Sequence, residues 1–386
     1  MKKNIKELIE KYQEIINSPQ NERNKQYWDR VYGWDRDMWR GIPKKSCWIP
    51  FTIAPDNSFW ANILKTDLRE YYSNPETYLE TQLKIRIYQY NNFDDNTYFT
   101  DELFIWFGVI TELSYFGAKT IFYPNREGWI EGNVISEYED LDKLKPPDFY
   151  KSGLMPRIHK YYEVLNEYAD GKLKVMFPEW VRGPFCLAAH LRGFENILMD
   201  TICEPEFVHK IMRFMVESNK GWNQERNKFL KTELKSCKLY NDEVGSPTIG
   251  PNTYKKFIFP YEKELSDYYG EVAYWHSCGN TTDFIEQINK LTNLRMYHCG
   301  PWTSYKKASE VLNKETTIDI NLDPQRDVYE SDEKLMVEKL KHIIANCKGL
   351  TYTIRADAFM PEGNISFVLD NIKRWNKVAL RILNKF

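Results

Sequence analysis

His276 and Cys278 are the residues whose types and spacing most clearly suggest chemistry in this sequence. They are separated by Ser277 and follow the apolar run 272–275, which is typical of a β-strand. Residues two apart in an extended chain face the same side, with backbones about 6–7 Å apart, so both side chains can reach one ion. Imidazole and thiolate together suit a borderline metal such as zinc. The pair predicts a metal site, with a core histidine beside a packed thiol as the alternative.

A zinc site needs at least one further protein ligand. Cys299 is the first candidate, because it ends the next strand-like run at the same level as Cys278. Asp242 or Glu243 is the second candidate, and Asp357 is the third. Cys299 also has an alternative interpretation as a buried thiol, since such a thiol behaves as a small hydrophobic side chain.

Asp242 and Glu243 are adjacent acids at the end of another strand-like run. They can ligate a metal, act as an acid or a base, or bind a cationic group, and we treat them as candidate catalytic residues. The alternative is that they cap a helix and solvate a loop. Cys186 follows a Gly-Pro-Phe turn and is a further thiol that can lie near the same rim.

Other polar and aromatic residues follow strand-like runs and are candidates for a substrate pocket. They are Glu179, Trp180, Asn241, Trp302, Asn321, Arg355 and Asp357. Arg355 and Arg182 can hold a carboxylate, because a guanidinium binds one in a bidentate manner. Tryptophans such as Trp180 and Trp302 can wall a pocket or contact a cation. Packing alone is the alternative for each of these side chains.

These residues are positioned by strand-like runs that alternate with helix-like runs. The strand-like runs are Cys47–Ala54, Leu103–Val109, Leu173–Pro178, Ser236–Tyr240, Val272–His276, Arg295–His298, Thr317–Ile320 and Leu350–Arg355. The helix-like runs include Pro75–Tyr90, Phe185–Thr201, Pro205–Leu230, Pro251–Tyr269, Thr281–Leu291, Ser304–Leu312, Asp332–Ala345 and Asn364–Leu383. The alternation predicts an α/β fold of the (β/α)8 TIM-barrel type, in which residues just after a strand face the catalytic mouth. A doubly wound open sheet is the alternative, but the sequence has no Gly-x-Gly-x-x-Gly loop.

The barrel is expected to span residues 46–386. Residues 1–45 are polar and helix-like, and they predict an N-terminal helical arm or cap. The segment near residues 120–136 is rich in Tyr, Trp and Gly, and it predicts an inserted hairpin instead of a barrel unit.

Composition and charge exclude several classes of protein. The 386 residues are 42% hydrophobic and 28% charged, enough to bury a core. The 53 Lys and Arg nearly balance the 55 Asp and Glu. The sequence therefore has neither the excess positive charge typical of nucleic-acid binding nor a polybasic patch for anionic membranes. No apolar run is long enough to span a bilayer, and the N-terminus lacks the apolar region of a signal peptide. Seven scattered cysteines argue against a disulfide framework, so a cytoplasmic location is expected.

Several segments resemble motifs of the uroporphyrinogen decarboxylase superfamily, in the same order along the chain. The segment 271–282, EVAYWHSCGNTT, resembles the strand-five signature of the corrinoid-dependent methyltransferase branch. Four further segments resemble motifs of the same superfamily. They are 183–185 (GPF), 191–195 (LRGFE), 242–261 (DEVGSPTIGPNTYKKFIFPY) and 321–324 (NLDP). An ordered series of motifs is far more specific than a single one. The resemblance extends from about residue 118 to the C-terminus.

That resemblance implies a zinc ion bound by His276 and Cys278, which activates the methyl donor or acceptor, and a corrinoid carried by a partner protein. Many zinc-binding relatives place a further cysteine between glycines after the last strand, where this sequence has Ala358. One of the candidate third ligands named above is then expected to replace that cysteine, unless the metal is lost. The departure favours a demethylase-type member, which takes methyl from a small methylated substrate, over a thiol-alkylating one.

The resemblance thus implies a methyltransferase that moves a methyl group from a methoxyaromatic, a methylamine or a methylthiol to a corrinoid. Zinc is expected on His276, Cys278 and Cys299, while Asp242 and Glu243 orient the substrate or act as the acid. The alternatives are a decarboxylase-like lyase and a non-catalytic barrel that binds a tetrapyrrole or a partner. The lyase is disfavoured because the decarboxylase's Arg-Gln-Ala-Gly-Arg loop has no counterpart here. A homodimer is left open.

Overall fold

The structure is a computed structural model that describes residues 3–35, 38–45, 48–357 and 365–383, apart from the side chains of residues 32–35, 38–40 and 357. Ala358, where the resemblance leads one to expect a cysteine, lies outside the described residues. None of the helices in these ranges combines the length and the apolar character needed to cross a membrane.

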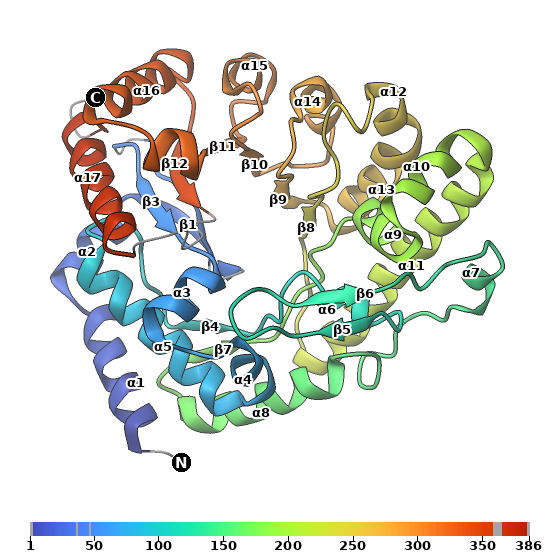
Figure 1. Ribbon diagram of the computed structural model, residues 1–386, viewed down its shortest axis with the longest axis horizontal. Helices are drawn as coiled ribbons and strands as arrows, with labels where there is room; N and C mark the ends of the chain where they lie inside the picture. The colour runs from blue at the N-terminus through green and yellow to red at the C-terminus, as the bar shows by residue number, and fades with distance from the viewer. Residues whose placement is uncertain (1–2, 36–37, 46–47, 358–364, 384–386) are drawn as a thin grey trace.

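Eight parallel strands form a barrel in the described part of the chain. They are β3 (Phe51–Ala54), β4 (Glu102–Phe104), β7 (Lys174–Met176), β8 (Cys237–Tyr240), β9 (Val272–His276), β10 (Met296–Cys299), β11 (Thr317–Leu322) and β12 (Tyr352–Asp357). Six of them pair in the order β3-β12-β11-β10-β9-β8, as Figure 1 shows, and β4 pairs with β7. A parallel bridge between Arg182 and Tyr240 joins the segment after β7 to β8, and Asn96 N donates to Phe51 O at 2.9 Å, which ties β3 to the segment that leads to β4. Each predicted strand-like run overlaps one of these strands, so the predicted barrel is confirmed.

Helices separate the strands along the chain. They are α3 (Asn57–Leu64), α4 (Leu68–Ser73), α5 (Pro75–Asn92), α6 (Thr111–Ser114), α7 (Asp140–Lys143), α8 (Met155–Ala169), α9 (Pro184–Arg192), α10 (Phe194–Cys203), α11 (Pro205–Leu230), α12 (Pro251–Thr253), α13 (Phe259–Tyr269), α14 (Ile285–Ile288), α15 (Tyr305–Val311), α16 (Glu333–Asn346) and α17 (Ile365–Leu383). Short 3-10 or π-helical turns occur at Tyr254–Ile258, Thr282–Phe284 and Pro324–Tyr329. In Figure 1, α13 to α17 follow one another along the outer side of the strands.

The N-terminal region consists of two helices and a hairpin. Helices α1 (Lys3–Ile16) and α2 (Pro19–Lys25) precede the antiparallel pair β1 (Trp28–Asp35) and β2 (Met38–Pro43). Helix α1 buries Ile5, Ile9 and Tyr12 and packs on α5. The helical part of the predicted arm therefore ends at Lys25, and the aromatic and β-branched residues that follow favour strands.

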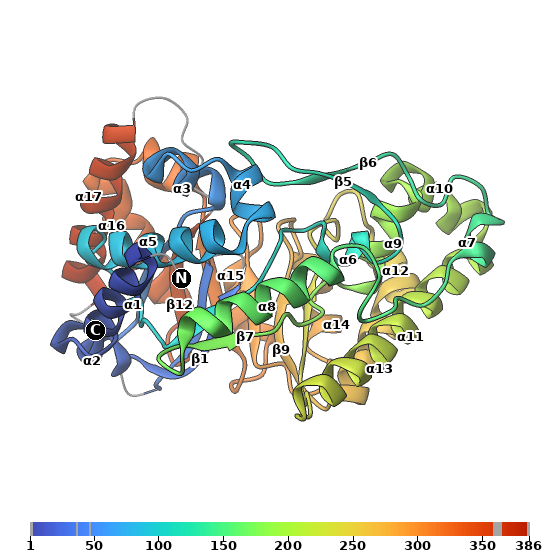
Figure 2. The same ribbon diagram turned by 90° about the horizontal axis from the view of Figure 1, so that it is seen from below.

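Three predicted helices are divided in the structure, and one of them, the run 251–269, contains α12, a π-helical turn and α13. The run 185–201 contains α9 and α10, which are separated at Gly193, whose φ of 92° is readily adopted only by glycine. The run 281–291 contains a 3-10 turn and the four-residue helix α14. A second antiparallel pair, β5 (Lys119–Ile121) and β6 (Trp129–Glu131), lies where the inserted hairpin is predicted, and Figure 2 shows it between α4 and α10.

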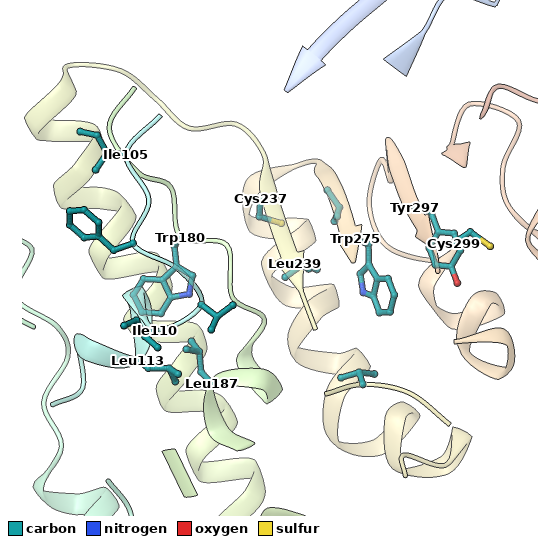
Figure 3. Packing of buried hydrophobic residues seen from close by; sticks show 14 of the residues in the cluster. Ile105, Ile110, Leu113, Trp180, Leu187, Cys237, Leu239, Trp275, Tyr297 and Cys299 are labelled. Atoms are coloured by element: carbon teal, nitrogen blue, oxygen red, sulfur yellow. The ribbon is translucent and has the colours of Figure 1, made fainter. Parts of the chain in front are cut away.

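Strand alternation separates the barrel interior from the core beneath the helices. Tyr240, Tyr274 and His276 share the interior, where their ring centroids lie 5.0 to 5.9 Å apart. Leu239 and Trp275, their neighbours along β8 and β9, belong to the main hydrophobic core that meets the helices (Figure 3). The interior face of β9 therefore leads directly to the mouth.

Candidate active site at the barrel mouth

The loops that follow β8 and β9 are locked against each other. Ser246 N donates to Asn280 O at 2.8 Å. A Cβ added to Gly245 would lie 2.8 Å from the Cα of Gly279, a distance that real side chains do not tolerate. The two glycines therefore fix the acid-bearing loop against the loop that carries Cys278.

Asp242, His276 and Cys278 form the first donor group at the mouth. His276 Nε2 lies 2.9 Å from Asp242 Oδ1, while Cys278 Sγ lies 3.3 Å from the same oxygen and 3.4 Å from Nε2. The three donor atoms lie within 4.8 Å of one another. His276 is buried, Asp242 is half-buried and Cys278 is exposed, so the group opens to solvent at the thiol.

His276 is held in place by its neighbours in the barrel. Its ring centroid lies 5.0 Å from that of Tyr240 and 4.1 Å from that of His298. Asn241 N donates to the His276 carbonyl at 2.8 Å, and His298 Nδ1 lies 2.8 Å from Ser277 O. These contacts orient the imidazole before any ligand binds. Little free energy is then needed to fix the side chain when a ligand does bind.

Cys186, His190 and Glu243 form the second donor group, beside the first. Cys186 and His190 are four residues apart on α9 and share one helical face. His190 Nε2 lies 2.6 Å from Glu243 Oε1, and Cys186 Sγ contacts Oε2. The donor atoms again lie within 4.8 Å of one another. Burial alone would raise the pKa of Glu243, but the His190 imidazole lowers this pKa below its ordinary value, which favours a carboxylate.

Arg182 lies between the two donor groups. Its Nη1 is 2.8 Å from both Asp242 Oδ2 and Cys186 Sγ, and the side chain is only 3% exposed. Glu112 on α6 accepts hydrogen bonds from Val181 N at 2.8 Å and Arg182 N at 3.3 Å. Burial alone would lower the pKa of Arg182, but the negative charge around it raises that pKa, so the guanidinium stays charged.

A buried acid supports the mouth from the helix side. Glu262 on α13 accepts hydrogen bonds from Asn241 Nδ2 at 2.8 Å, Tyr254 OH at 2.6 Å and Trp275 Nε1 at 3.1 Å. Burial raises the pKa of Glu262 to about 7, although these donors oppose the shift. Because Asn241 directly precedes Asp242, this network anchors the start of the acid-bearing loop.

Comparison with known proteins identifies the family. The sequence profile described as Uroporphyrinogen decarboxylase (URO-D) matches residues 57–354, well over half of the chain. The chain belongs to the uroporphyrinogen decarboxylase family. The resemblance found in the sequence motifs is thereby confirmed.

Several methyltransferases are similar to this family member. A methylcobamide:CoM methyltransferase, MtbA, of Methanosarcina acetivorans is 24% identical over 219 residues, which are 55% of this chain and 61% of that protein. A methylated-thiol–coenzyme M methyltransferase of Methanosarcina mazei is 21% identical over 187 residues, 48% of each chain. The chain thus spans between about half and three fifths of these relatives. A solved structure, a methyltransferase from Methanosarcina mazei, has a TM-score of 0.63 at 11% identity and covers 86% of this chain and 94% of that chain, which shows a shared fold.

The structure brings four of the predicted site residues of this family member into the two donor groups. His276 and Cys278 meet with Asp242 in the first group, and Glu243 lies in the second. Asp242 is therefore the third donor beside the predicted pair.

Cys299, the predicted third ligand, lies apart from both donor groups. It is 1% exposed in the hydrophobic core, and its thiol lies 3.6 Å from Thr303 O (Figure 3). The register explains this position: Tyr297 pairs with Trp275, so Cys299 lies on the same outward face of the sheet. A shift of one residue would have turned it toward the mouth.

Two candidate pocket residues face the helices. Trp180 is 2% exposed, and Figure 3 shows it among apolar side chains such as Leu113 and Leu187. Asn241 is fully buried and donates to Glu262, as described above. Neither side chain lines the mouth.

Two further candidates form ion pairs inside the barrel. Arg355 Nη2 lies 2.9 Å from Asp319 Oδ2, and each residue is 1% exposed. Glu179 Oε2 lies 3.3 Å from Lys238 Nζ. These acids and bases face each other within the barrel instead of the open mouth.

Asn321 and Trp302 keep positions that suit substrate contact, and the roles of these two residues and of Asp357 stay predictions. Asn321 Oδ1 is buried without a hydrogen-bond partner among the described residues. Trp302 is 59% exposed on the loop after β10, with the Arg326 guanidinium 5.6 Å from its ring. Asp357 ends β12, but its side chain lies outside the described residues.

His190 and Glu112 are site residues that the sequence interpretation missed. The spacing Cys186-x-x-x-His190 is a usable signal, because it places two metal-binding side chains on one helical face. Their partner Glu243 lies 57 residues after Cys186, so only the tertiary structure brings the three together. Glu112 is an isolated acid with no signal in the sequence.

The first donor group fits zinc. Imidazole, thiolate and carboxylate are the three ligand types that zinc uses, and three protein ligands leave one position for a substrate. Zinc bonds of about 2.0–2.3 Å in a tetrahedron place the donors roughly 3.3–3.8 Å apart. The separations of 2.9, 3.3 and 3.4 Å between these donors are close to that range.

Proposed function

We propose that the chain is a methyltransferase that works with a corrinoid carried by a separate protein. The first donor group carries this proposal, because it lies at the carboxyl ends of β8 and β9, where barrel enzymes hold their reactive residues. The similar proteins are named for methyl transfer involving a methylcobamide or a methylated thiol and coenzyme M, which supports a methyl group as the transferred unit.

Asp242, His276 and Cys278 are the residues that would hold zinc. A zinc ion there would supply Lewis acidity to a heteroatom of the methyl donor or acceptor. Asp242 stands in for the cysteine that many relatives carry at the position of Ala358. A carboxylate is a harder and weaker electron donor than a thiolate, so this set favours polarising a methylated substrate over activating a thiol.

Arg182 orients the Asp242 carboxylate. It binds Oδ2 at 2.8 Å, which leaves Oδ1 facing His276 and Cys278. A charge-assisted hydrogen bond of this kind fixes the rotation of the carboxylate and offsets its charge. Glu112 positions Arg182 in turn, because it binds the backbone N–H groups of residues 181 and 182.

The substrate we propose is a small methylated compound: a methoxyaromatic, a methylamine or a methylthiol. Cys278 is exposed, so the substrate and a corrinoid on a partner protein can approach the donor group from solvent. Asn321 and Trp302 follow or end neighbouring strands and are the side chains that we expect the substrate to meet. A cytoplasmic location and a homodimer stay predictions from the sequence.

Metal content and methyl transfer test this function. We expect His276→Ala to lose about one zinc ion per chain relative to the wild type, while His209→Ala, which changes a half-buried histidine on α11, loses none. We expect free cob(I)alamin to be methylated, followed by its absorbance, with at least one of the three donor classes. Unchanged zinc in His276→Ala would contradict the metal site. Absence of methylcobalamin with every donor, or release of carbon dioxide from a porphyrinogen, would contradict the transferase.

A further inference from the structure

The second donor group has the composition of a metal site in its own right. We propose that Cys186, His190 and Glu243 bind a second divalent cation of the borderline class, such as Zn²⁺ or Co²⁺, separate from an ion in the first donor group. The proposal goes beyond the methyl transfer proposed above, because it rests on the geometry of these three side chains and on Arg182.

Helix α9 supplies two of the three ligands. Cys186 and His190 lie one helical turn apart, a spacing that lets two side chains reach one ion from the same face. Glu243 comes from the loop after β8, and its two oxygens reach the two helical ligands separately: Oε1 lies 2.6 Å from His190 Nε2, and Oε2 contacts Cys186 Sγ. The donors therefore come from two different elements and converge.

The geometry of His190 points to a common third partner. Nε2 is buried and lies 2.6 Å from Glu243 Oε1, and it has no other partner within the described part of the chain. A buried imidazole nitrogen and a carboxylate oxygen at this separation are placed as two ligands of one ion are.

The chemistry of the three donors matches a borderline cation. Thiolate, imidazole and carboxylate are each zinc ligands, and three of them leave an open coordination position. Arg182 Nη1 donates to Cys186 Sγ at 2.8 Å, and this contact holds the sulfur atom at the group. His190 and Glu243 are half-buried, while Cys186 and the Nε2 atom of His190 are buried, so the group is largely enclosed.

Arg182 also keeps the two donor groups apart. The same Nη1 atom is 2.8 Å from Asp242 Oδ2 and from Cys186 Sγ, so a positive charge separates the acid of one group from the thiol of the other. Asp242 and Glu243 are adjacent in the chain but turn to opposite groups. A single cation cannot draw on both sets without displacing this buried guanidinium, which favours two ions over one shared ion.

The test counts metal ions per chain in matched variants. Wild-type chain reconstituted with Zn²⁺ and freed of excess metal is expected to hold about two ions. His190→Gln and His276→Gln are each expected to lose about one, and the double variant to lose both. His209→Gln is the matched control, since it replaces a half-buried histidine outside both groups. Circular dichroism and thermal unfolding of each variant verify that it is folded.

Cobalt gives a second readout that does not depend on activity. In the chain reconstituted with Co²⁺, the thiolate-to-cobalt absorption is expected to fall by roughly half in Cys186→Ser, because one of two thiolate-bearing sites is lost. Cys347→Ser, which changes another buried cysteine, is expected to leave it unchanged.

The outcomes separate this inference from the proposed function. One ion that His190→Gln retains and His276→Gln loses overturns the second site and leaves the first intact. One ion with the reverse behaviour supports metal binding by the second group and overturns the zinc site of the proposed function. One ion lost in both single variants means a shared ion and overturns the separate site. A cobalt spectrum that Cys186→Ser does not change also overturns it.

Discussion

The barrel interior and the barrel mouth both contain buried charged side chains, but they use them differently. In the interior, Asp319 is bound by Arg355 at 2.9 Å, Tyr274 at 2.6 Å and Thr353 at 3.0 Å, and it is 1% exposed. Each partner there donates, so the network closes on the single carboxylate. A single carboxylate surrounded by hydrogen-bond donors offers a metal ion only one ligand.

At the mouth, by contrast, several Lewis bases face one another around one cation. Asp242, His276 and Cys278 converge on one side of Arg182, and the second donor group lies on the other. The thiol of the first group is exposed. The difference shows that burial and charge alone do not identify a functional site in this protein. Converging electron-pair donors with access to solvent do.

Asp319→Ala is the change with the largest expected effect, and it falls in the interior. It removes the Asp319 carboxylate that binds the Arg355 guanidinium, which is 1% exposed. Removing one partner of a buried ion pair costs about 3–5 kcal/mol, because an uncompensated charge stays in the core. We expect that loss in the free energy of unfolding, measured by denaturant titration, with the zinc content unchanged.

The corresponding mouth variant completes that experiment. His276→Ala should lose metal but less stability than Asp319→Ala, when both are measured without added zinc. If His276→Ala lost more stability than Asp319→Ala, the proposed difference between interior and mouth would be wrong. Asp319→Asn keeps the size of the side chain and should fall between the wild type and Asp319→Ala.

Glu262 sharpens the comparison, since this buried acid faces only neutral donors. Its pKa is raised from 4.5 to about 7, so the folded state holds a proton that the unfolded state releases at lower pH. The stability that this proton contributes is complete below pH 4.5 and is lost as the pH rises through about 7. The expected loss is about 3 kcal/mol, since each pKa unit is worth 1.36 kcal/mol.

Glu262→Gln is the matched control for this pH dependence. The amide keeps the size of the side chain and does not titrate, so the difference in unfolding free energy between wild type and variant should shift in favour of the variant as the pH rises. A difference that stays constant from about pH 5 to 8 would show that Glu262 keeps an ordinary pKa.

The sequence was sufficient for the barrel because local patterns determine it. Each strand is a short apolar run, and helix α11 has the bounds that its proline and its pattern predict, Pro205–Leu230. Gly193 marks the one long predicted helix that breaks at a glycine, and only its φ of 92° in the structure shows the break. The β1–β2 hairpin was missed because its aromatic residues were interpreted as anchors of a helical arm.

The site was predictable only where its residues are close in sequence. The pairing of His276 with Cys278 follows from strand alternation, and the proximity of the acids follows because the carboxyl ends of neighbouring parallel strands meet at one rim. Cys299 shows the limit of predicting side-chain direction from the sequence. A register shift of one residue determines the face of the sheet on which a side chain lies. His190 meets Glu243 only through tertiary packing, which no local pattern encodes.

Gly279→Ala tests whether the mouth depends on the approach of its two loops. A Cβ added at Gly279 would lie 2.8 Å from the Gly245 Cα, so the loops must separate. Overpacking of this kind costs about 1–3 kcal/mol. Because the displaced loop carries Cys278, we also expect zinc affinity to fall about 10- to 100-fold, as it does when support of a metal site is lost. Competition with a chelator measures the affinity.

Gly221→Ala is the control for that experiment. Gly221 lies on α11 with no atom within 4 Å of an added Cβ, so alanine should leave zinc binding unchanged and the helix slightly more stable. A Gly279→Ala variant with wild-type zinc affinity would show that the ligands do not need the locked loops.

Trp302→Ala has the smallest expected effect, and it compares the mouth with the opposite end of the barrel. Trp302 is 59% exposed after β10, while Trp48 is 54% exposed before β3. An exposed tryptophan of this kind contributes up to about 1 kcal/mol through contacts such as that with Arg326, so neither alanine variant should lose much stability. If Trp302 contacts the substrate, its removal should raise KM by about fivefold, the equivalent of about 1 kcal/mol, with kcat unchanged. Trp48→Ala should leave both constants at the wild-type value. KM is measured for both variants with the methyl donor that supports turnover. Equal KM values would show that Trp302 does not contact the substrate and that recognition depends on the deeper residues of the mouth.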